Sequence, residues 1–221
     1  MNRLNIGMAR PTKKMKSNTY YHGTATEKAG QGILKHGITP PDLTDRKGKL
    51  KPIDGRVYLT HKLEYALVYL LQGNVLGSSY VMPSWDKEPY GYLFVIDGKS
   101  LVDIQPDEDN VGELIWDTLD HNKGGWRDTP FNWLMKLAKE KLTNYQYSKV
   151  KEGEYADWAV AGKKLIPLMT DMQKLQIIES GAHISHTGKI IPSQSWKFEK
   201  INAKNLLSDG SNFFELAERI K

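Results

Sequence analysis

Short apolar runs alternate along the chain with segments of helical spacing. Residues 91–96 form the clearest run, and their aromatic and β-branched side chains favour a strand. Residues 27–36 instead place Ile33 and Leu34 on one side of a helix, and Gly37 suits its C-terminal cap. The same reasoning predicts strands at 19–24, 56–60, 158–161 and 196–201, and helices at 63–71, 111–119, 130–142, 169–179 and 212–220.

The order of these elements predicts the fold class and the domain organisation. Strands and helices follow one another without regular β-α-β alternation, which favours an α+β fold. Residues 1–17 are predicted to form a basic arm, residues 18–221 one domain, and residues 103–150 a helical insertion within that domain. The tryptophans of the insertion could stack nucleic-acid bases, but a small core of the insertion is the favoured interpretation. They are Trp116, Trp126 and Trp133.

Charge is distributed unevenly over the 221 residues. The formal net charge is +5, yet residues 103–128 hold eight acidic side chains against Lys123 and Arg127, a local charge of −6. The rest of the chain therefore carries +11. The first 26 residues contain no acid, which indicates an arm that contacts nucleic-acid phosphates, with a solvated tail as the alternative. The basic residues of this arm are Arg3, Arg10, Lys13, Lys14 and Lys16.

Composition excludes several kinds of site. The chain has no cysteine, which excludes disulfides and thiolate metal ligands. No apolar run approaches the roughly 18 residues that a membrane span needs, and the basic N-terminus lacks the apolar stretch of a secretory signal. A cytoplasmic protein without membrane contact is therefore expected. His183 and His186 are predicted to lie in a solvent-facing turn rather than to bind a metal.

Three short motifs carry a resemblance to a known family. His22-Gly23 ends an apolar run, Tyr58 follows in the next predicted strand, and Tyr69 comes eleven residues after Tyr58. With these motifs the sequence resembles the ADP-ribosyltransferase family, in the branch of diphtheria toxin and the poly(ADP-ribose) polymerases. The resemblance implies an α+β fold in which a split β-sandwich surrounds an NAD cleft. It also implies NAD as co-substrate and no metal.

The resemblance assigns cofactor-binding roles to residues of these motifs. In the family the motif histidine hydrogen-bonds the adenosine ribose, and the following glycine meets the nicotinamide amide through its backbone. Two tyrosine rings hold the cationic nicotinamide between them. Ala66 departs from the polymerase pattern, which has a hydroxyl at this position. The candidates for NAD binding are His22, Gly23, Thr24, Tyr58 and Tyr69.

The family also requires an acidic residue on a late strand, and two registers supply one. Glu152-Gly153-Glu154 has the Glu-x-Glu form of arginine-directed and several nucleotide-directed members, with the second glutamate catalytic and the first activating the acceptor. Asp157, followed by Trp158, matches the polymerase strand pattern but has a shorter side chain. Glu154 is the favoured catalytic residue, and Asp157 is the alternative.

These features together predict a mono-ADP-ribosyltransferase that moves ADP-ribose from NAD to a macromolecule and releases nicotinamide. The small size favours a bacterial or phage toxin or effector, and a toxin could have a neutralising partner protein. RNA or DNA is slightly favoured over protein as the acceptor, because the charge outside the insertion is positive. The alternatives are an NAD glycohydrolase and a non-enzymatic basic module that binds nucleic acid.

Overall fold

The computed structural model describes residues 19–40, 53–72, 90–101, 103–123, 130–153, 155–181, 183–193 and 196–202. Within them the strands are β1 (Thr19–Thr24), β2 (Arg56–Thr60), β3 (Tyr90–Asp97), β4 (Ile104–Pro106), β5 (His183–Thr187) and β6 (Lys197–Asn202). The α-helices are α1 (Glu27–His36), α2 (Leu63–Gln72), α3 (Glu108–Lys123), α4 (Asn132–Lys141), α5 (Asn144–Glu152), α6 (Tyr155–Leu165) and α7 (Asp171–Ser180). Two short 3-10 helices cover Gly98–Ser100 and Ile166–Leu168.

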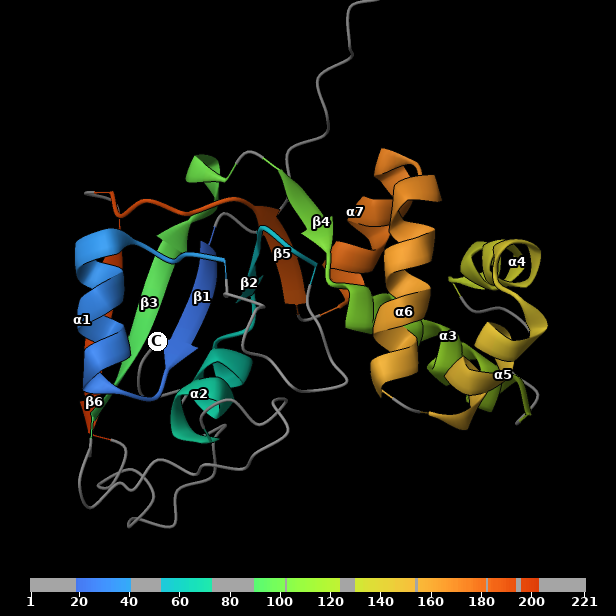
Figure 1. Cartoon of the computed structure of the whole chain (residues 1–221), viewed down its shortest axis with the longest axis horizontal. Coiled ribbons are helices and arrows are strands. Elements are labelled where there is room, and N and C mark those ends of the chain that lie inside the picture. The colour runs from blue at the N-terminus through green and yellow to red at the C-terminus, as the bar shows by residue number, and fades with distance from the viewer. Residues whose placement is uncertain are drawn as a thin grey trace, which may run out of the picture.

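The strands form one antiparallel sheet in the order β4-β5-β2-β1-β3-β6 (Figure 1). β1 pairs with β3 along its whole length, from Thr19 to Thr24. By contrast, β1 and β2 share the single register pair Tyr21 and Thr60. The sheet therefore consists of two three-stranded halves that meet closely at one point. The mixed architecture confirms the α+β prediction.

Helices α1 and α2 cover opposite faces of this sheet. A Cβ on Gly30 of α1 would lie 2.2 Å from the Tyr92 ring, so α1 packs on the face to which Tyr92 points. A Cβ on Gly23 of β1 would lie 2.0 Å from the Ala66 carbonyl oxygen of α2. Neighbouring residues of a strand point to opposite faces. Thr24, which pairs with Tyr92, therefore lies on the α1 face, and Gly23 lies on the α2 face.

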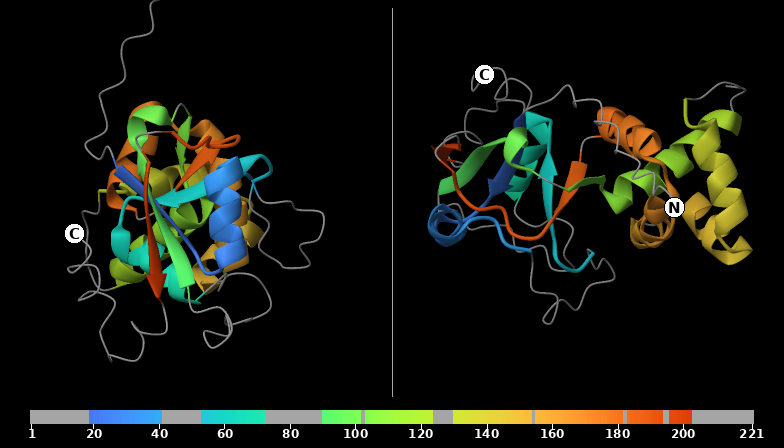
Figure 2. Two further views of the ribbon diagram at one scale, coloured as in Figure 1. Left: turned by 90° about the vertical axis from the view of Figure 1, so that its left-hand side faces the viewer. Right: turned by 90° about the horizontal axis from the view of Figure 1, so that it is seen from above.

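Helices α3 to α7 form a second layer, called here the helical unit, at the β4 end of the sheet (Figures 1 and 2). Its core combines apolar side chains from all five helices, among them Ile115, Leu134 and Ile177. Trp116 and Trp133 pack partly buried against this core, which supports their structural interpretation; Trp126 lies outside the described residues.

Helix α7 joins the two layers through adjacent side chains. Ile177 belongs to the core of the helical unit, whereas Ile178 belongs to the core of the sheet, with Ile184 and Leu59. Both isoleucines are buried, so the layers cannot separate without exposing one of them. The sheet and the helical unit are therefore packed against each other and are not connected only by the polypeptide segments between them.

The strand predicted at 158–161 is wrong, because these residues lie within α6. Trp158, Ala161 and Leu165 are all buried in the core of the helical unit. Their spacing of three and four residues is helical, and a strand would have placed neighbouring residues on opposite faces. Alanine favours the helix further. Asp157 therefore begins a helix and does not lie on a strand.

The solvent-facing turn predicted around His183 is also wrong. His183 and His186 lie in β5, between β4 and β2, and His186 is 4% exposed. Long-range pairing buries these polar residues, although their local sequence favours a turn. The predicted basic arm at 1–17 and the predicted helix at 212–220 lie outside the described residues. Over the described ranges, the helices are too short or too polar to cross a membrane.

Close packing of α3 against α6 makes Gly162 sensitive to substitution. A Cβ on Gly162 would lie 2.0 Å from the carbonyl oxygen of Glu108, and backbone atoms cannot give way as a flexible side chain does. We expect Gly162→Ala to lower the free energy of unfolding by about 1–3 kcal/mol, measured by urea denaturation.

Gly32→Ala is the matched control, because a Cβ at Gly32 meets no atom within 4 Å. Gly32 lies in α1, where alanine should stabilise the helix by about 0.5–1 kcal/mol. Equal stability of the two variants would contradict the described crossing of α3 and α6.

Candidate functional site

His22 links the two halves of the sheet at the point where β1 and β2 diverge. Its Nδ1 lies 3.3 Å from the main-chain oxygen of Tyr58, and a carbonyl can only accept, so Nδ1 carries the hydrogen. Burial lowers the pKa of His22, against the smaller effect of this hydrogen bond. The ring is therefore neutral near pH 7, and its Nε2 is left as an acceptor for a hydroxyl group.

The Tyr58 hydroxyl lies in a buried polar network that connects β2 to α3. It donates to Oε1 of Glu108 at 2.6 Å and accepts from the backbone N–H of Ile53 at 2.8 Å. The same N–H also lies 3.2 Å from Glu108 Oε1. Burial, and then the negative charge of Glu108, raises the pKa of Tyr58. The hydroxyl therefore stays protonated and holds the ring to the first turn of α3.

Gly23 and Tyr69 meet the same region from β1 and α2. The close approach of Ala66 and Leu70 to Gly23 leaves no room for a side chain, so the glycine sets the distance between α2 and β1. Tyr69 of α2 packs edge-on against the His183 ring, with 5.7 Å between ring centroids. His183 pairs with Thr60 at the end of β2.

His183 is a site residue that the sequence did not single out as such. Tyr65 also packs edge-on against it, with centroids 4.9 Å apart. Burial lowers the pKa of His183 to about 4, and the charges of His61 and Lys62 add to this effect. The imidazole is therefore neutral near pH 7 and belongs to an aromatic group formed by α2 and β5.

The remaining cofactor-binding candidate, Thr24, lies apart from Tyr58. Sheet register places His22 and Thr24 opposite Phe94 and Tyr92, on the face that α1 covers. Tyr58 lies on the α2 face instead, because Thr60, two residues along β2, pairs with Tyr21 on that face. His22 contacts β2 through its hydrogen bond to the main-chain oxygen of Tyr58. Thr24 makes no such hydrogen bond to β2 among the described residues.

The acidic candidates do not meet the His22 and Tyr58 region in the part of the chain that the structure describes. Glu152 is exposed at the end of α5 and forms an ion pair with Lys149. Asp157 lies in the first turn of α6, beside Trp158, which packs against Gly112 of α3. Glu154 lies outside the described residues, and its role stays a prediction.

Glu108 is the described carboxylate that contacts a motif residue. It is 2% exposed, and its second oxygen, Oε2, has no hydrogen-bond partner among the described residues. The sequence did not single it out, because acidic residues are common in the first turn of a helix, where they interact favourably with the helix dipole. The contact with Tyr58 joins residues 50 positions apart, which no local pattern reveals.

Glu108 lies in a cluster of carboxyl groups at the start of α3. Burial, followed by the charges of Asp109 and Glu108, raises the pKa of Asp107 well above its usual range. Burial and the Glu108 charge raise the pKa of Asp109 to about 7, while Lys163 opposes the shift. No group of three or more side chains is arranged to hold a metal ion within the described ranges.

Comparisons of the chain with protein-family models, with curated proteins and with solved structures found no match. The function proposed below therefore rests on the residues of this chain and on the resemblance that their motifs carry.

The raised pKa of Asp109 predicts a pH-dependent effect of its substitution. Between pH 3.8 and about 7 the folded state binds more protons at this site than the unfolded state, so its contribution to stability falls as pH rises. Asp109→Asn removes this dependence. We expect the variant to match the parent at pH 4 and to exceed its free energy of unfolding by about 1–2 kcal/mol at pH 8.

Urea denaturation across this pH range measures the difference. Glu140→Gln on α4 is the matched control, because it makes the same kind of acid-to-amide change at an exposed position outside the carboxyl cluster. An Asp109→Asn difference that stays constant from pH 4 to pH 8 would show that Asp109 titrates normally.

Proposed function

We propose that the protein is an NAD-dependent ADP-ribosyltransferase that acts on a macromolecule. The observation that carries this proposal is the meeting of three sequence motifs in one region. His22 of β1 hydrogen-bonds the main chain at Tyr58 of β2, and Gly23 packs on α2, which carries Tyr69. The resemblance to the transferase family assigns NAD binding to these residues, and their proximity supports that assignment.

The chemistry requires a site that binds a cationic ring and stabilises a developing cation. The bond between ribose C1′ and the nicotinamide nitrogen breaks, and nicotinamide leaves as a neutral ring with the bonding electron pair. A nucleophilic atom of the acceptor then bonds to C1′ and loses its proton. Aromatic faces at Tyr58 and Tyr69 suit the cationic ring, and the acceptor Nε2 of His22 suits a ribose hydroxyl.

Glu108 is the carboxylate that we assign to this site, as a positioning residue that acts through Tyr58. Its hydrogen bond fixes the Tyr58 ring, and its charge lies in a buried region where electrostatic effects are strong. Glu152 and Asp157 lie in helices α5 and α6 of the helical unit, and neither contacts Tyr58 among the described residues. Glu154, between them in sequence, remains the competing assignment for the acid.

An NAD glycohydrolase would use the same residues with water as the nucleophile. A nucleic-acid-binding module would have no use for a neutral, half-buried histidine next to Tyr58 and should not respond to NAD. Incubation with labelled NAD and cell lysate, followed by separate nuclease and protease digestion, distinguishes these functions. Transfer gives a labelled macromolecule, hydrolysis gives free ADP-ribose, and a binding module gives neither.

Loss of the His22 ring should abolish turnover. We expect His22→Ala to lower nicotinamide release by about 10² or more, because a preorganised contact to the ribose is lost. Release is measured with NAD labelled in the nicotinamide ring, and circular dichroism checks the fold. His36→Ala at the exposed end of α1 is the control. Full turnover of a folded His22→Ala variant would overturn the proposal.

The charge of Glu108 should matter beyond its hydrogen bonds. Glutamine at this position can still accept from Tyr58 and from Ile53, so Glu108→Gln removes charge while retaining the network. We expect kcat to fall by about 10² with little change in KM. A purely structural role predicts that Glu108→Gln retains kcat and that only Glu108→Ala loses it.

The same assay decides between the two carboxylates. Glu140→Gln serves as the control, because Glu140 is exposed on α4 and has no assigned role in the site. If Glu154→Gln abolishes turnover while Glu108→Gln retains it, the acid is Glu154, as the sequence predicts, and the assignment of Glu108 is wrong.

A further inference from the structure

A pocket of about 700 Å³ lies between the sheet and the helical unit. The sheet contributes Arg56 of β2, Gln105 of β4 and Ser185 of β5 to its wall. The helical unit contributes Lys163 of α6 and Lys174 of α7. Its volume lies within the range of small-molecule binding pockets, and it is much larger than a single phosphate requires.

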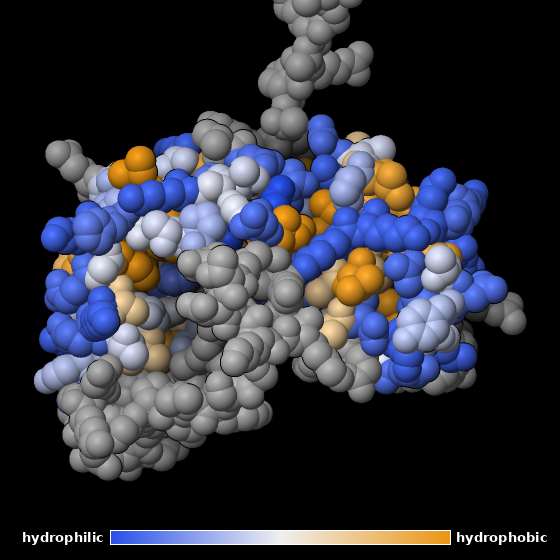
Figure 3. All heavy atoms as spheres, in the orientation of Figure 1, coloured by the Kyte–Doolittle hydropathy of each residue, from blue (hydrophilic) through white to orange (hydrophobic). Residues whose placement is uncertain are grey.

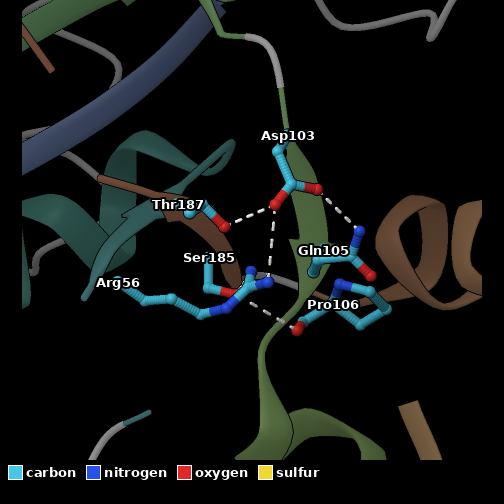
Figure 4. Close-up of polar contacts among 6 residues, drawn as sticks. All are labelled: Arg56, Asp103, Gln105, Pro106, Ser185 and Thr187. Carbon is cyan, nitrogen blue, oxygen red and sulfur yellow. Dashed lines mark hydrogen bonds and ion pairs between the residues drawn. The ribbon is translucent and has the colours of Figure 1, made fainter. Parts of the chain in front are cut away.

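Arg56 is held in a fixed position at the sheet side of this pocket (Figure 4). Its Nη1 donates to Oγ of Ser185 at 3.0 Å, and its Nη2 lies 3.5 Å from Oδ2 of Asp103. Asp103 in turn accepts hydrogen bonds from Thr187 and Gln105, which lower its pKa, Thr187 most strongly. Strands β2, β4 and β5 thus present a guanidinium group whose position is set before any ligand arrives.

Two lysines face Arg56 from the helical unit, and the wall contains one carboxylate, Asp54. Lys163 interacts electrostatically with Asp109. The half-buried Lys174 has no carboxylate within ion-pair distance of its ammonium group among the described residues. Asp103 pairs with Arg56, and Asp109 interacts with Lys163, so Lys174 is the cation of this wall that can attract the phosphate of a ligand.

Apolar side chains line the rest of the pocket, so its ligand is not a simple anion. Ile53, Ile166 and Pro167 contribute to the wall beside the lysines. A nucleotide combines a flat base, which can be buried against aliphatic side chains, with a phosphate, which a lysine attracts, and so matches both parts of this lining. Hydrophilic side chains dominate the face shown in Figure 3, with smaller hydrophobic areas between them.

We propose that this pocket binds a nucleotide of a single-stranded nucleic-acid acceptor, with its phosphate on Lys174 and its base against Ile53 and Ile166. The inference rests on the proposed function, because it assumes that NAD binds between Tyr58 and His22. Strand order places the pocket strands β5 and β4 on the side of Tyr58 away from β1 and His22. NAD would extend from Tyr58 toward His22, which leaves the pocket open to the acceptor.

The test measures binding of a fluorescent single-stranded oligonucleotide to the full-length protein by anisotropy over a range of salt concentrations. We expect Lys174→Gln to weaken binding at low salt and to reduce the slope of log K against log salt by about 1. Lys139→Gln is the matched control, because Lys139 is exposed on α4 and lies outside the pocket wall. Its slope should equal that of the parent.

Any one of four outcomes would overturn the inference. The parent could fail to bind the oligonucleotide, Lys174→Gln could behave as Lys139→Gln does, or excess NAD could displace the oligonucleotide, which would assign the pocket to the pyrophosphate of NAD. Label from NAD that appears only in protein would also exclude a nucleic-acid acceptor. Conversely, Lys174-dependent binding by a parent that releases no nicotinamide would support the pocket and reject the proposed function.

Discussion

The hydrogen bond between the Tyr58 hydroxyl and Glu108 is the contact on which the arrangement of sheet and site depends. It joins the middle of β2 to the first residue of α3, where Glu108 is buried and Tyr58 is half-buried. A buried carboxylate is costly unless donors surround it, and here one oxygen receives both the hydroxyl and the Ile53 N–H. The start of the helical unit is thereby fixed against the strand that carries the proposed nicotinamide-binding ring.

Two glycine contacts set the remaining distances around this hydrogen bond. Gly162 allows α6 to approach the Glu108 backbone, and Gly23 allows α2 to approach β1. A larger residue at Gly162 would push α6 away from the carboxylate, and one at Gly23 would move Tyr69 away from β1. The site therefore lies where these two close packings meet the Tyr58–Glu108 hydrogen bond, which gives its side chains little freedom to reorient.

Local sequence patterns predicted the elements whose apolar face and end caps are encoded in their own residues. The helix at 27–36 has its apolar side, its Thr26 N-cap and its terminal Gly37, and the structure confirms all of its length. The segment from Asp157 was ambiguous, because alanine and tryptophan beside valine suit a strand or a helix. Packing against Gly112 decided in favour of the helix. Sequence alone could not place His183 or Glu108, since their contacts join positions far apart in the chain.

The order of strands places His22 and the cationic residues on opposite sides of Tyr58. His22 lies on β1, Tyr58 on the neighbouring β2, and Arg56 and Ser185 stand on the same face as Tyr58 toward β5. A positive charge on His22 would attract the phosphates of NAD, as the lysines of the pocket would. Here the histidine is neutral, and the cations stand beyond Tyr58. Under the proposed function, NAD would therefore bind mainly through hydrogen bonds and aromatic contacts, and charge would attract the acceptor from the opposite side.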